Sequence, residues 1–378
     1  MAEHFFYEEE SSWAAPLPRK IGIVFCTSRE TEVPKGRESE KVSDCEVLEV
    51  ADATQTALTE LGCSADLIDL DPDQITSLRK YDWVFNLAET IFGFPLADYQ
   101  VAHMMEKEQI QFTGSNSSTL QACLNKVTTK CQLLRNGIGT PMFEVFLPGQ
   151  SIINWLDYPL IVKPACEDGS TGITLESVVY NFTELECQVT KVHQVYQQAA
   201  LVEQFIDGRD ITASILGNGS DSVVLPLSEI TYPEMMGPKF LTFNAKWLPG
   251  TSDYQVTTAK CPCPLDPWVE KRMKEIALRA YQVMGCRDYA RVDFRVKGNL
   301  PYVLEVNPNP CINPDDSGFV RSSKASGLTY TQMIAAIIRS SVKNRCQEMD
   351  SFCYGGLECK QKLFKSLEEG YNPLTGNS

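Results

Sequence analysis

The residues whose side chains are best suited to take part in a reaction lie in two short segments towards the C-terminal end of the chain. They run Tyr289-Ala-Arg-Val-Asp-Phe-Arg295 and Tyr302-Val-Leu-Glu-Val-Asn-Pro308, and a Lys297-Gly-Asn299 turn joins them. Two strands joined by a short turn form an antiparallel hairpin whose side chains alternate between two faces. The pattern predicts an apolar face made of Val292, Phe294, Leu304 and Val306. The opposite face takes four polar side chains, Arg291, Asp293, Glu305 and Asn307.

The polar face of this hairpin is a candidate metal site. Mg²⁺ prefers hard oxygen ligands, and two carboxylates with one amide oxygen supply them. Arg291, on the same face, could stabilise negative charge on a transferred phosphoryl group or on a tetrahedral intermediate. A hairpin with one polar face is also the ordinary pattern of a sheet that faces water, so this segment alone leaves both interpretations open.

Two segments upstream are candidate nucleotide-binding elements. The apolar run Pro159-Leu-Ile-Val-Lys163 predicts a buried strand, and the loop after it contains Gly169-Ser-Thr-Gly172. Backbone N–H groups of such a loop can bind phosphate, and Lys163 adds a positive charge. Leu201-Val-Glu-Gln-Phe-Ile-Asp-Gly-Arg-Asp210 predicts a strand that ends in acidic residues and a glycine turn, which could bind an adenine and ribose hydroxyls. Either segment alone is more often a plain turn or sheet edge.

Taken together and in this order, the segments resemble the ATP-grasp superfamily, and within it the D-alanine–D-alanine ligases. The resemblance covers about residues 19–340, and its order is more specific than any one motif. Three further segments fit the same pattern, namely Phe85-Asn-Leu-Ala-Glu89, Thr113-Gly-Ser115 and Gly137-Ile-Gly-Thr-Pro141. The resemblance implies an α/β chain with a three-domain ATP-grasp fold. An N-terminal open α/β domain precedes two α+β domains that hold ATP between them.

The resemblance also implies a role for particular residues. Lys126, Lys163 and Lys246 would contact the ATP phosphates, with Lys246 on a mobile loop, and Ser170 and Thr171 would lie in the loop that closes over them. Glu203, Gln204 and Ile206 would line the adenine, and Asp210 would bind the ribose. Asp293, Glu305 and Asn307 would hold two Mg²⁺ ions, with Mn²⁺ as an alternative metal. The implied catalytic residues are Arg291, Lys246 and Ser170, and the substrate candidates are Asp44, Glu46, Glu89, Asp316 and Ser317.

The implied activity is formation of an amide or peptide bond. A substrate carboxylate attacks the γ-phosphate of ATP, and an amine then attacks the acyl phosphate to give the amide, ADP and phosphate. The expected substrates are small amino-acid-like molecules. The alternative is a nucleotide-binding regulatory module without ligase activity.

The elements around these motifs predict how the chain is divided. We expect a tail at 1–18, an N-terminal α/β domain at 19–114, a central ATP-grasp domain at 115–205, a C-terminal ATP-grasp domain at 206–345 and a second tail at 346–378. Expected strands include 20–26 and a hairpin of 211–216 with 223–230, and one helix is expected over 119–136. A further helix should begin after an Asp266 N-cap and end at Gly285.

Composition limits the partners. The net charge of −15 disfavours a nucleic-acid surface, and no apolar run is long enough for a membrane helix. The 14 cysteines and three histidines show no metal-ligand spacing, and the acidic N-terminal residues do not form a secretion signal. We therefore expect a cytoplasmic protein, with a homodimer as an analogy to the family.

Overall fold

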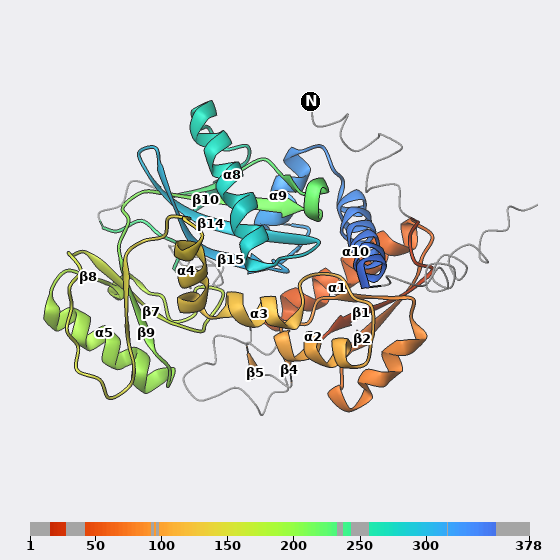
Figure 1. Cartoon of the computed structure of the whole chain (residues 1–378), viewed down its shortest axis with the longest axis horizontal. Coiled ribbons are helices and arrows are strands. Elements are labelled where there is room, and N and C mark those ends of the chain that lie inside the picture. Colours follow the sequence, from red (N-terminus) through yellow and green to blue (C-terminus); the bar gives the residue numbers. More distant parts are fainter. Residues whose placement is uncertain are drawn as a thin grey trace, which may run out of the picture.

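The computed structural model describes residues 16–27, 42–91, 94–95, 98–232, 237–242, 257–315 and 317–352. Lys246 and Asp316 lie outside the described residues, as do the side chains of Asp44 and Glu46 in the first turns of helix α1. The described chain forms three main sheets that follow one another along the sequence (Figure 1). This architecture confirms the predicted α/β fold class.

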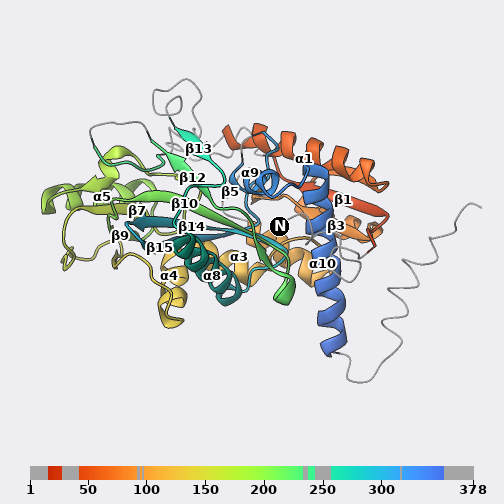
Figure 2. The same cartoon turned by 90° about the horizontal axis from the view of Figure 1, so that it is seen from above.

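The first sheet is parallel and has the strand order β2-β1-β3. Its strands are β1 (Lys20–Phe25), β2 (Ser64–Asp69) and β3 (Trp83–Asn86). The helices around it are α1 (Val42–Glu60), η3 (Pro72–Lys80), α2 (Asp98–Lys107) and α10 (Tyr330–Phe352), and a short ladder joins β4 (Thr90–Ile91) to β5 (Phe94–Pro95). Side chains of β1 alternate between two cores, because Ile21 and Ile23 pack with α1 and α10 whereas Val24 packs with η3 and α2. Figure 2 shows α10, the last described helix, beside the first strands of the chain.

The second sheet is antiparallel, with the order β6-β9-β7-β8, and α5 covers one face. Its elements are β6 (Phe143–Phe146), β7 (Leu160–Pro164), η4 (Leu175–Ser177), β8 (Val178–Val179), α5 (Phe182–Val195) and β9 (Ala200–Gln204). Two helices, α3 (Ser117–Leu124) and α4 (Lys126–Arg135), precede it, so the single helix predicted over 119–136 is wrong. Asn125 separates them because its backbone is extended and its side chain accepts a hydrogen bond from the Thr128 N–H at 3.0 Å, which caps α4.

The third sheet has the order β13-β12-β10-β14-β15, and β11 pairs with the end of β10. Its strands are β10 (Arg209–Leu216), β11 (Val223–Val224), β12 (Ser228–Thr231), β13 (Thr258–Lys260), β14 (Tyr289–Lys297) and β15 (Leu300–Pro308). The helical elements beside it are η5 (Gly219–Asp221), α8 (Pro267–Met284) and α9 (Gly318–Ala325). The predicted caps of α8 are confirmed, since Asp266 accepts from the Trp268 N–H and Gly285 ends the helix in the left-handed region. The strand predicted over 223–230 is split, because Pro226 has no N–H to donate to a ladder.

A β-bulge corrects one predicted face of the hairpin. Asp293 pairs with Glu305, but the next residue, Phe294, pairs with Val303. Leu304 is the extra residue, so it lines a pocket on the polar side, and the fully buried Val303 takes the core position. The other predicted polar positions keep their register, with Arg291 opposite Asn307.

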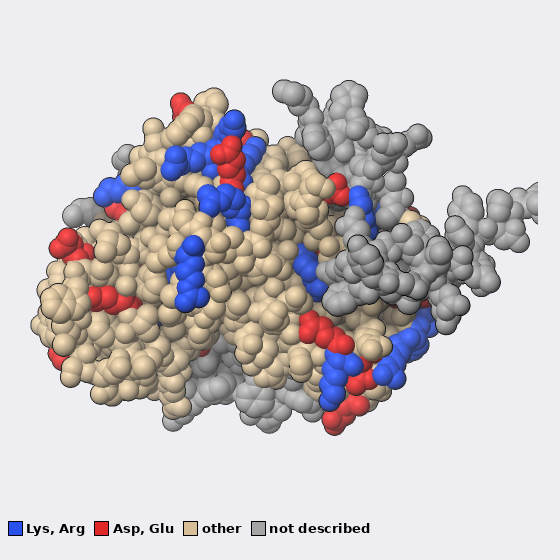
Figure 3. All heavy atoms as spheres, viewed as in Figure 1, with Lys and Arg blue, Asp and Glu red and all other residues tan. Residues whose placement is uncertain are grey.

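The charged surface is mixed on the face that Figure 3 shows. Basic and acidic side chains alternate along α8, where Lys274 pairs with Glu270 at 2.7 Å. None of the described helices combines the length and the apolar character that spanning a membrane requires.

A tight contact joins the first sheet to the third. The backbone N–H of Gly114 donates to Asp288 at 2.7 Å, and the N–H of Ser115 donates to the Asn309 Oδ1 at 2.8 Å. Gly114 has a φ of +88°, and a Cβ there would lie 2.2 Å from the Asn309 side chain. The Thr113-Gly-Ser115 motif therefore fixes the segment after β15 against the N-terminal part of the chain.

Replacing Gly114 with Ala should destabilise the protein by about 3 kcal/mol. Two costs add, that of a left-handed backbone at a residue with a Cβ and that of the steric clash of this Cβ. Gly137→Ala is the matched control, because Gly137 has a φ of +67° and a Cβ there would meet no atom within 4 Å. The control should cost only about 1 kcal/mol. Denaturant midpoints of both variants test this, and equal losses would contradict the tight contact at Gly114.

Candidate active site

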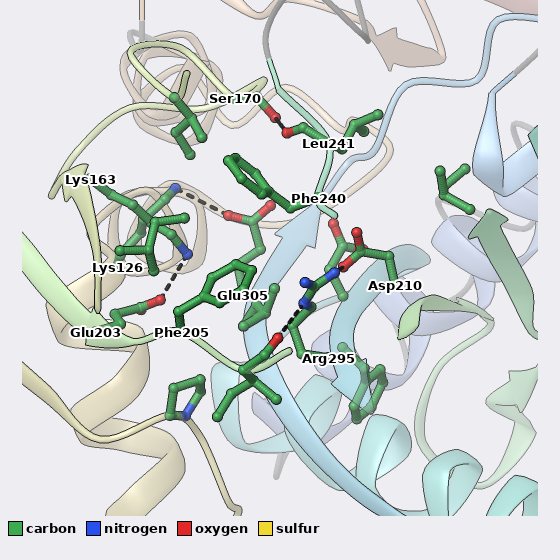
Figure 4. A pocket seen from close by; sticks show the side chains of 18 of the residues that line it. Lys126, Lys163, Ser170, Glu203, Phe205, Asp210, Phe240, Leu241, Arg295 and Glu305 are labelled. Atoms are coloured by element: carbon green, nitrogen blue, oxygen red, sulfur yellow. Dashed lines mark hydrogen bonds and ion pairs between the residues drawn. The ribbon is translucent and has the colours of Figure 1, made fainter. Parts of the chain in front are cut away.

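A pocket lies between the second and third sheets (Figure 4). Its empty volume is about 1020 Å³, counting space open to solvent. Ten of the residues predicted from the sequence line it, namely Lys126, Lys163, Ser170, Thr171, Glu203, Gln204, Ile206, Asp210, Asp293 and Glu305. We call this space the nucleotide pocket, after the role that the sequence resemblance implies for its lining residues. The fold thus brings together segments that are far apart in the sequence.

Glu203 is the central ion-pairing residue of one wall. Its carboxylate lies 2.6 Å from the Lys130 Nζ and 2.7 Å from the Lys163 Nζ. Lys130 is fully buried and also donates to the Thr140 hydroxyl at 2.6 Å. The carboxylate therefore joins α4, β7 and β9 and fixes the Lys163 ammonium at the pocket wall.

These ion pairs determine the charge state of Glu203 and affect that of Lys130. Burial alone would raise the pKa of Glu203, but Lys130 and Lys163 outweigh it and lower the pKa from 4.5 to about 2. Burial lowers the pKa of Lys130, and the attraction of Glu203 opposes that change. Glu203 is thus an anion at neutral pH.

The other end of the pocket is more apolar and contains a second ion-pair group. The Phe205 and Phe240 rings meet edge to face at 5.9 Å, and the Arg295 guanidinium lies 5.4 Å from the Phe205 ring centre. Arg295 also lies 2.6 Å from the Asp210 Oδ1, and the Tyr232 hydroxyl donates to the other Asp210 oxygen. Asp210 is therefore held rigidly at the pocket wall.

The polar face of the hairpin forms the floor between these two ends. The Arg291 guanidinium binds both oxygens of Asp293, at 2.7 and 2.8 Å. The Asn307 Nδ2 lies 3.0 Å from Asp293 and 3.4 Å from Glu305. Lys126, at the start of α4, lies 3.1 Å from the Glu305 Oε2. The three predicted metal ligands converge, and cations surround them.

The cations keep this floor charged. Burial opposes ionisation of Glu305, but Lys126 and Arg291 hold its pKa well below the ordinary range. Burial likewise disfavours the charged form of Arg291, and Asp293 more than compensates, so the pKa of Arg291 is raised. The pKa of Lys126 is raised in the same way by Glu305 and Asp168. The electrostatic balance of the floor therefore depends on both signs being present.

Two smaller cavities lie near the hairpin, and only the first of them adjoins the nucleotide pocket. The first, which we call the hairpin cavity, shares Lys126, Glu167 and Glu305 with it and is also lined by Asn307 and Asp168. The second, the strand-end cavity, lies where β3 ends and is lined by Asn86, Glu89, Tyr289, Asn309 and Cys311 among others. One residue, Asp98, lines both small cavities.

The predicted substrate residues occupy different places. Glu89 is exposed and lines the strand-end cavity. Ser317 is the N-cap of α9, and its hydroxyl accepts a hydrogen bond from the Val320 N–H at 3.2 Å. Arg291 lines none of the three cavities, although it lies beside the floor through Asp293.

Sequence reasoning missed several residues of the site. Lys130 stood four residues after Lys126 on a predicted helix, a spacing that could have placed both on one face. Arg295 ends one of the quoted motifs and Tyr232 lies in none, but neither was expected in the site, because their role depends on Asp210 lying across the sheet. Asp98 carried no signal either, since only the fold brings it to the hairpin.

Comparisons with known proteins identify the family to which this fold belongs. A family model described as D-ala D-ala ligase C-terminus matches residues 144–339. The D-alanine–D-alanine ligase of Methylacidiphilum infernorum is 32% identical over 326 residues, which covers 86% of this chain and 96% of that protein. The uncharacterized protein y4sG of Sinorhizobium fredii is 31% identical over 303 residues, covering 76% of this chain and 86% of that protein. A crystal structure of D-alanine–D-alanine ligase from Bacillus anthracis complexed with ATP gives a TM-score of 0.69 at 22% identity, covering 87% of this chain and 99% of that one.

The fold and the site define an ATP-dependent carboxylate–amine ligase of the ATP-grasp type. The relatives above that have a stated activity are ligases, and they give no support to the regulatory alternative. The chain belongs to the D-alanine–D-alanine ligase family, as the sequence resemblance predicted.

Glu203→Gln should destabilise the protein by about 3 kcal/mol at pH 7, because it leaves Lys130 buried without its counter-charge. Since the pKa of Glu203 is lowered from 4.5 to about 2, its stabilisation is complete above pH 4.5 and is lost as the pH falls towards 2. The two proteins should therefore converge in stability at low pH. Unfolding free energies measured from pH 7 to pH 2 test this.

The control is Glu108→Gln, which breaks a 2.7 Å ion pair with the exposed Arg79. This surface pair should contribute only about 0.5 kcal/mol. A Glu203→Gln variant no less stable than this control would contradict the role assigned to the wall.

Proposed function

We propose that this chain uses ATP to join two amino acids, or amino-acid-like molecules, through an amide bond. One observation carries the proposal: the acidic and amide side chains of the hairpin converge beside Lys126 and Lys163 at one side of a pocket whose other end is aromatic. An acyl-phosphate ligase needs this combination, because it must bind a nucleotide and neutralise charge at the transferred phosphoryl group.

The nucleotide pocket suits ATP in a defined orientation. The apolar end, with Ile206 and Phe240, accepts the adenine beside the backbone of Gln204, and Asp210 accepts ribose hydroxyls. Lys126 and Lys163 bind the phosphates, and Ser170 and Thr171 cover them. The Ser170 hydroxyl already contacts the Leu241 carbonyl at 3.2 Å, which joins the glycine loop to the opposite wall. Lys246 is the candidate for a further phosphate contact from outside the described residues.

Magnesium fits the hairpin floor by ligand chemistry. Asp293, Glu305 and Asn307 provide two carboxylates and an amide oxygen, which are ligands that Mg²⁺ prefers. No cluster of three or more His, Cys, Asp or Glu side chains suited to a metal occurs in the described part of the chain, so Asn307 is needed to complete the set. Bound metal would neutralise phosphate oxygens and polarise the reacting phosphoryl group. The same residues would accept Mn²⁺.

The protein residues then act by position and charge. Lys126 and Lys163 orient the phosphate chain, and Arg291 stabilises the negative charge on the acyl phosphate and on the tetrahedral intermediate. The glycine loop excludes water, which would otherwise hydrolyse the acyl phosphate. The strand-end cavity, with Glu89, is the candidate amino-acid site.

The proposal also covers the division of the chain into domains, its localisation and its partners. The expected units 19–114, 115–205 and 206–345 would place the nucleotide between the second and third. A cytoplasmic homodimer follows from the family resemblance alone, and so do small amino-acid-like partners in place of nucleic acid or a membrane.

Asp293→Asn and Glu305→Gln should each lower turnover at least about 100-fold, because each removes a metal-binding charge. Turnover is measured as phosphate release from ATP with Mg²⁺ and a pool of glycine, L-amino acids and D-alanine, and mass spectrometry identifies the product. Asp221→Asn, which removes a half-exposed ion pair with Lys343, is the control and should retain full activity. Wild-type protein that forms no amide with this pool would count against the ligase, and unchanged turnover in both variants would remove the metal role.

Lys163→Met tests the orientation of the nucleotide. The variant should bind ATP about 10-fold more weakly and AMP almost unchanged, because the lysine contacts the outer phosphates. Titration calorimetry with both nucleotides measures the difference. Equal losses for ATP and AMP would place the phosphates elsewhere.

A further inference from the structure

Asp98 occupies a special position between the two small cavities. It is the first residue of α2, and its half-buried side chain lines both the hairpin cavity and the strand-end cavity. Among the described lining residues of those two cavities, it alone is common to both. Asp98 can therefore be contacted from either cavity.

Within the described part of the chain, no cation pairs with the carboxylate of Asp98. It accepts a hydrogen bond from the Tyr99 N–H at 2.7 Å, and within the described residues it forms no ion pair with a Lys, Arg or His. Burial, together with the negative Asp168, raises the pKa of Asp98 to about 7. This contrasts with Asp293, Glu305 and Glu203, each of which has a cation within 3.1 Å. A half-buried carboxylate without a counter-ion is costly unless a ligand supplies the positive charge.

The two cavities indicate which ligand that is. The hairpin cavity contains Lys126, Glu305 and Asn307, where the proposed function would form the acyl phosphate. The strand-end cavity, proposed above as the amino-acid site, would hold the second molecule. Its lining adds the carboxylate of Glu89 and apolar side chains such as Val47 and Ile312, and no described Lys or Arg lines it. The approaching molecule is therefore expected to present a positive group towards Asp98.

We infer that Asp98 binds the amino group of the amine substrate and holds it between the strand-end cavity and the hairpin cavity. This inference rests on the proposed ligase function. The ammonium loses one proton to solvent, which gives a free lone pair, and the nitrogen attacks the acyl carbonyl carbon. The new C–N bond forms, the C–O bond to phosphate breaks and phosphate leaves with the bonding electrons. The nitrogen then releases its second proton to solvent. Asp98 positions the nitrogen for this attack and takes no part in phosphoryl transfer.

Asp98→Asn separates the two halves of the reaction. With ATP, Mg²⁺ and the amino-acid pool, peptide formation should fall about 10- to 100-fold, because a charge-assisted hydrogen bond is lost. In a second assay, about 0.5 M hydroxylamine is added to the same mixture and takes the place of the amine as acceptor. Hydroxamate formation should then stay within about 3-fold of wild type, because this small uncharged nucleophile needs no carboxylate to hold it. The loss in peptide formation should appear as a higher KM for the amine with the KM for ATP unchanged.

Two controls keep the test decisive. Asp52→Asn makes the same change at an exposed position of α1 and should alter neither product. Asp98→Glu keeps the charge and should recover part of the peptide formation. ATP binding and melting temperature are measured for all variants.

Each outcome has one meaning. Loss of both products in Asp98→Asn, or of neither, overturns the inference, and so does an Asp98→Glu variant no better than Asp98→Asn. Wild-type protein that makes neither hydroxamate nor peptide overturns the proposed function itself. Wild-type activity with an unaffected Asp98→Asn variant overturns the inference alone.

Discussion

The ion pairs that Glu203 makes with Lys130 and Lys163 are the constraint on which the site depends. The carboxylate is buried between two ammonium groups, at 2.6 and 2.7 Å, and each group comes from a different element. Because an unpaired charge in this position would be strongly unfavourable, the three elements must keep their relative positions. Lys163 is consequently held at the pocket wall before any ligand arrives, which lowers the cost of ordering it on binding.

The charged side chains at the floor of the pocket are also paired, but here the carboxylates are the groups that face a ligand. Asp293 and Glu305 are neutralised by Arg291 and Lys126 in the free protein. A nucleotide with its metal brings both a cation for the carboxylates and anions for the lysine and arginine. Under the proposed function, binding would exchange partners without leaving any charge buried and unpaired, so the dense charged cluster would be stable with and without its substrate.

Local patterns in the sequence predicted the hairpin, the glycine loop and the caps of α8, because alternation, loop glycines and capping residues act over a few residues. The sequence did not reveal the break at Asn125, since a helical pattern continued across it, and did not place Leu304, since the bulge changes the register by one residue. Lys130 and Asp98 were missed for a different reason. Their environments are made by partners more than 60 residues away in sequence, such as Glu203 for Lys130 and Asp168 for Asp98.

The most direct test of this exchange of charge partners is a crystal structure with a non-hydrolysable ATP analogue and Mg²⁺. We expect the analogue to occupy the nucleotide pocket and the Lys126–Glu305 and Arg291–Asp293 contacts, now 3.1 and 2.7 Å, to lengthen as the carboxylates turn to the metal. The Glu203 ion pairs should remain unchanged. A nucleotide bound elsewhere, or bound here with both floor contacts intact and no metal at the carboxylates, would contradict the exchange.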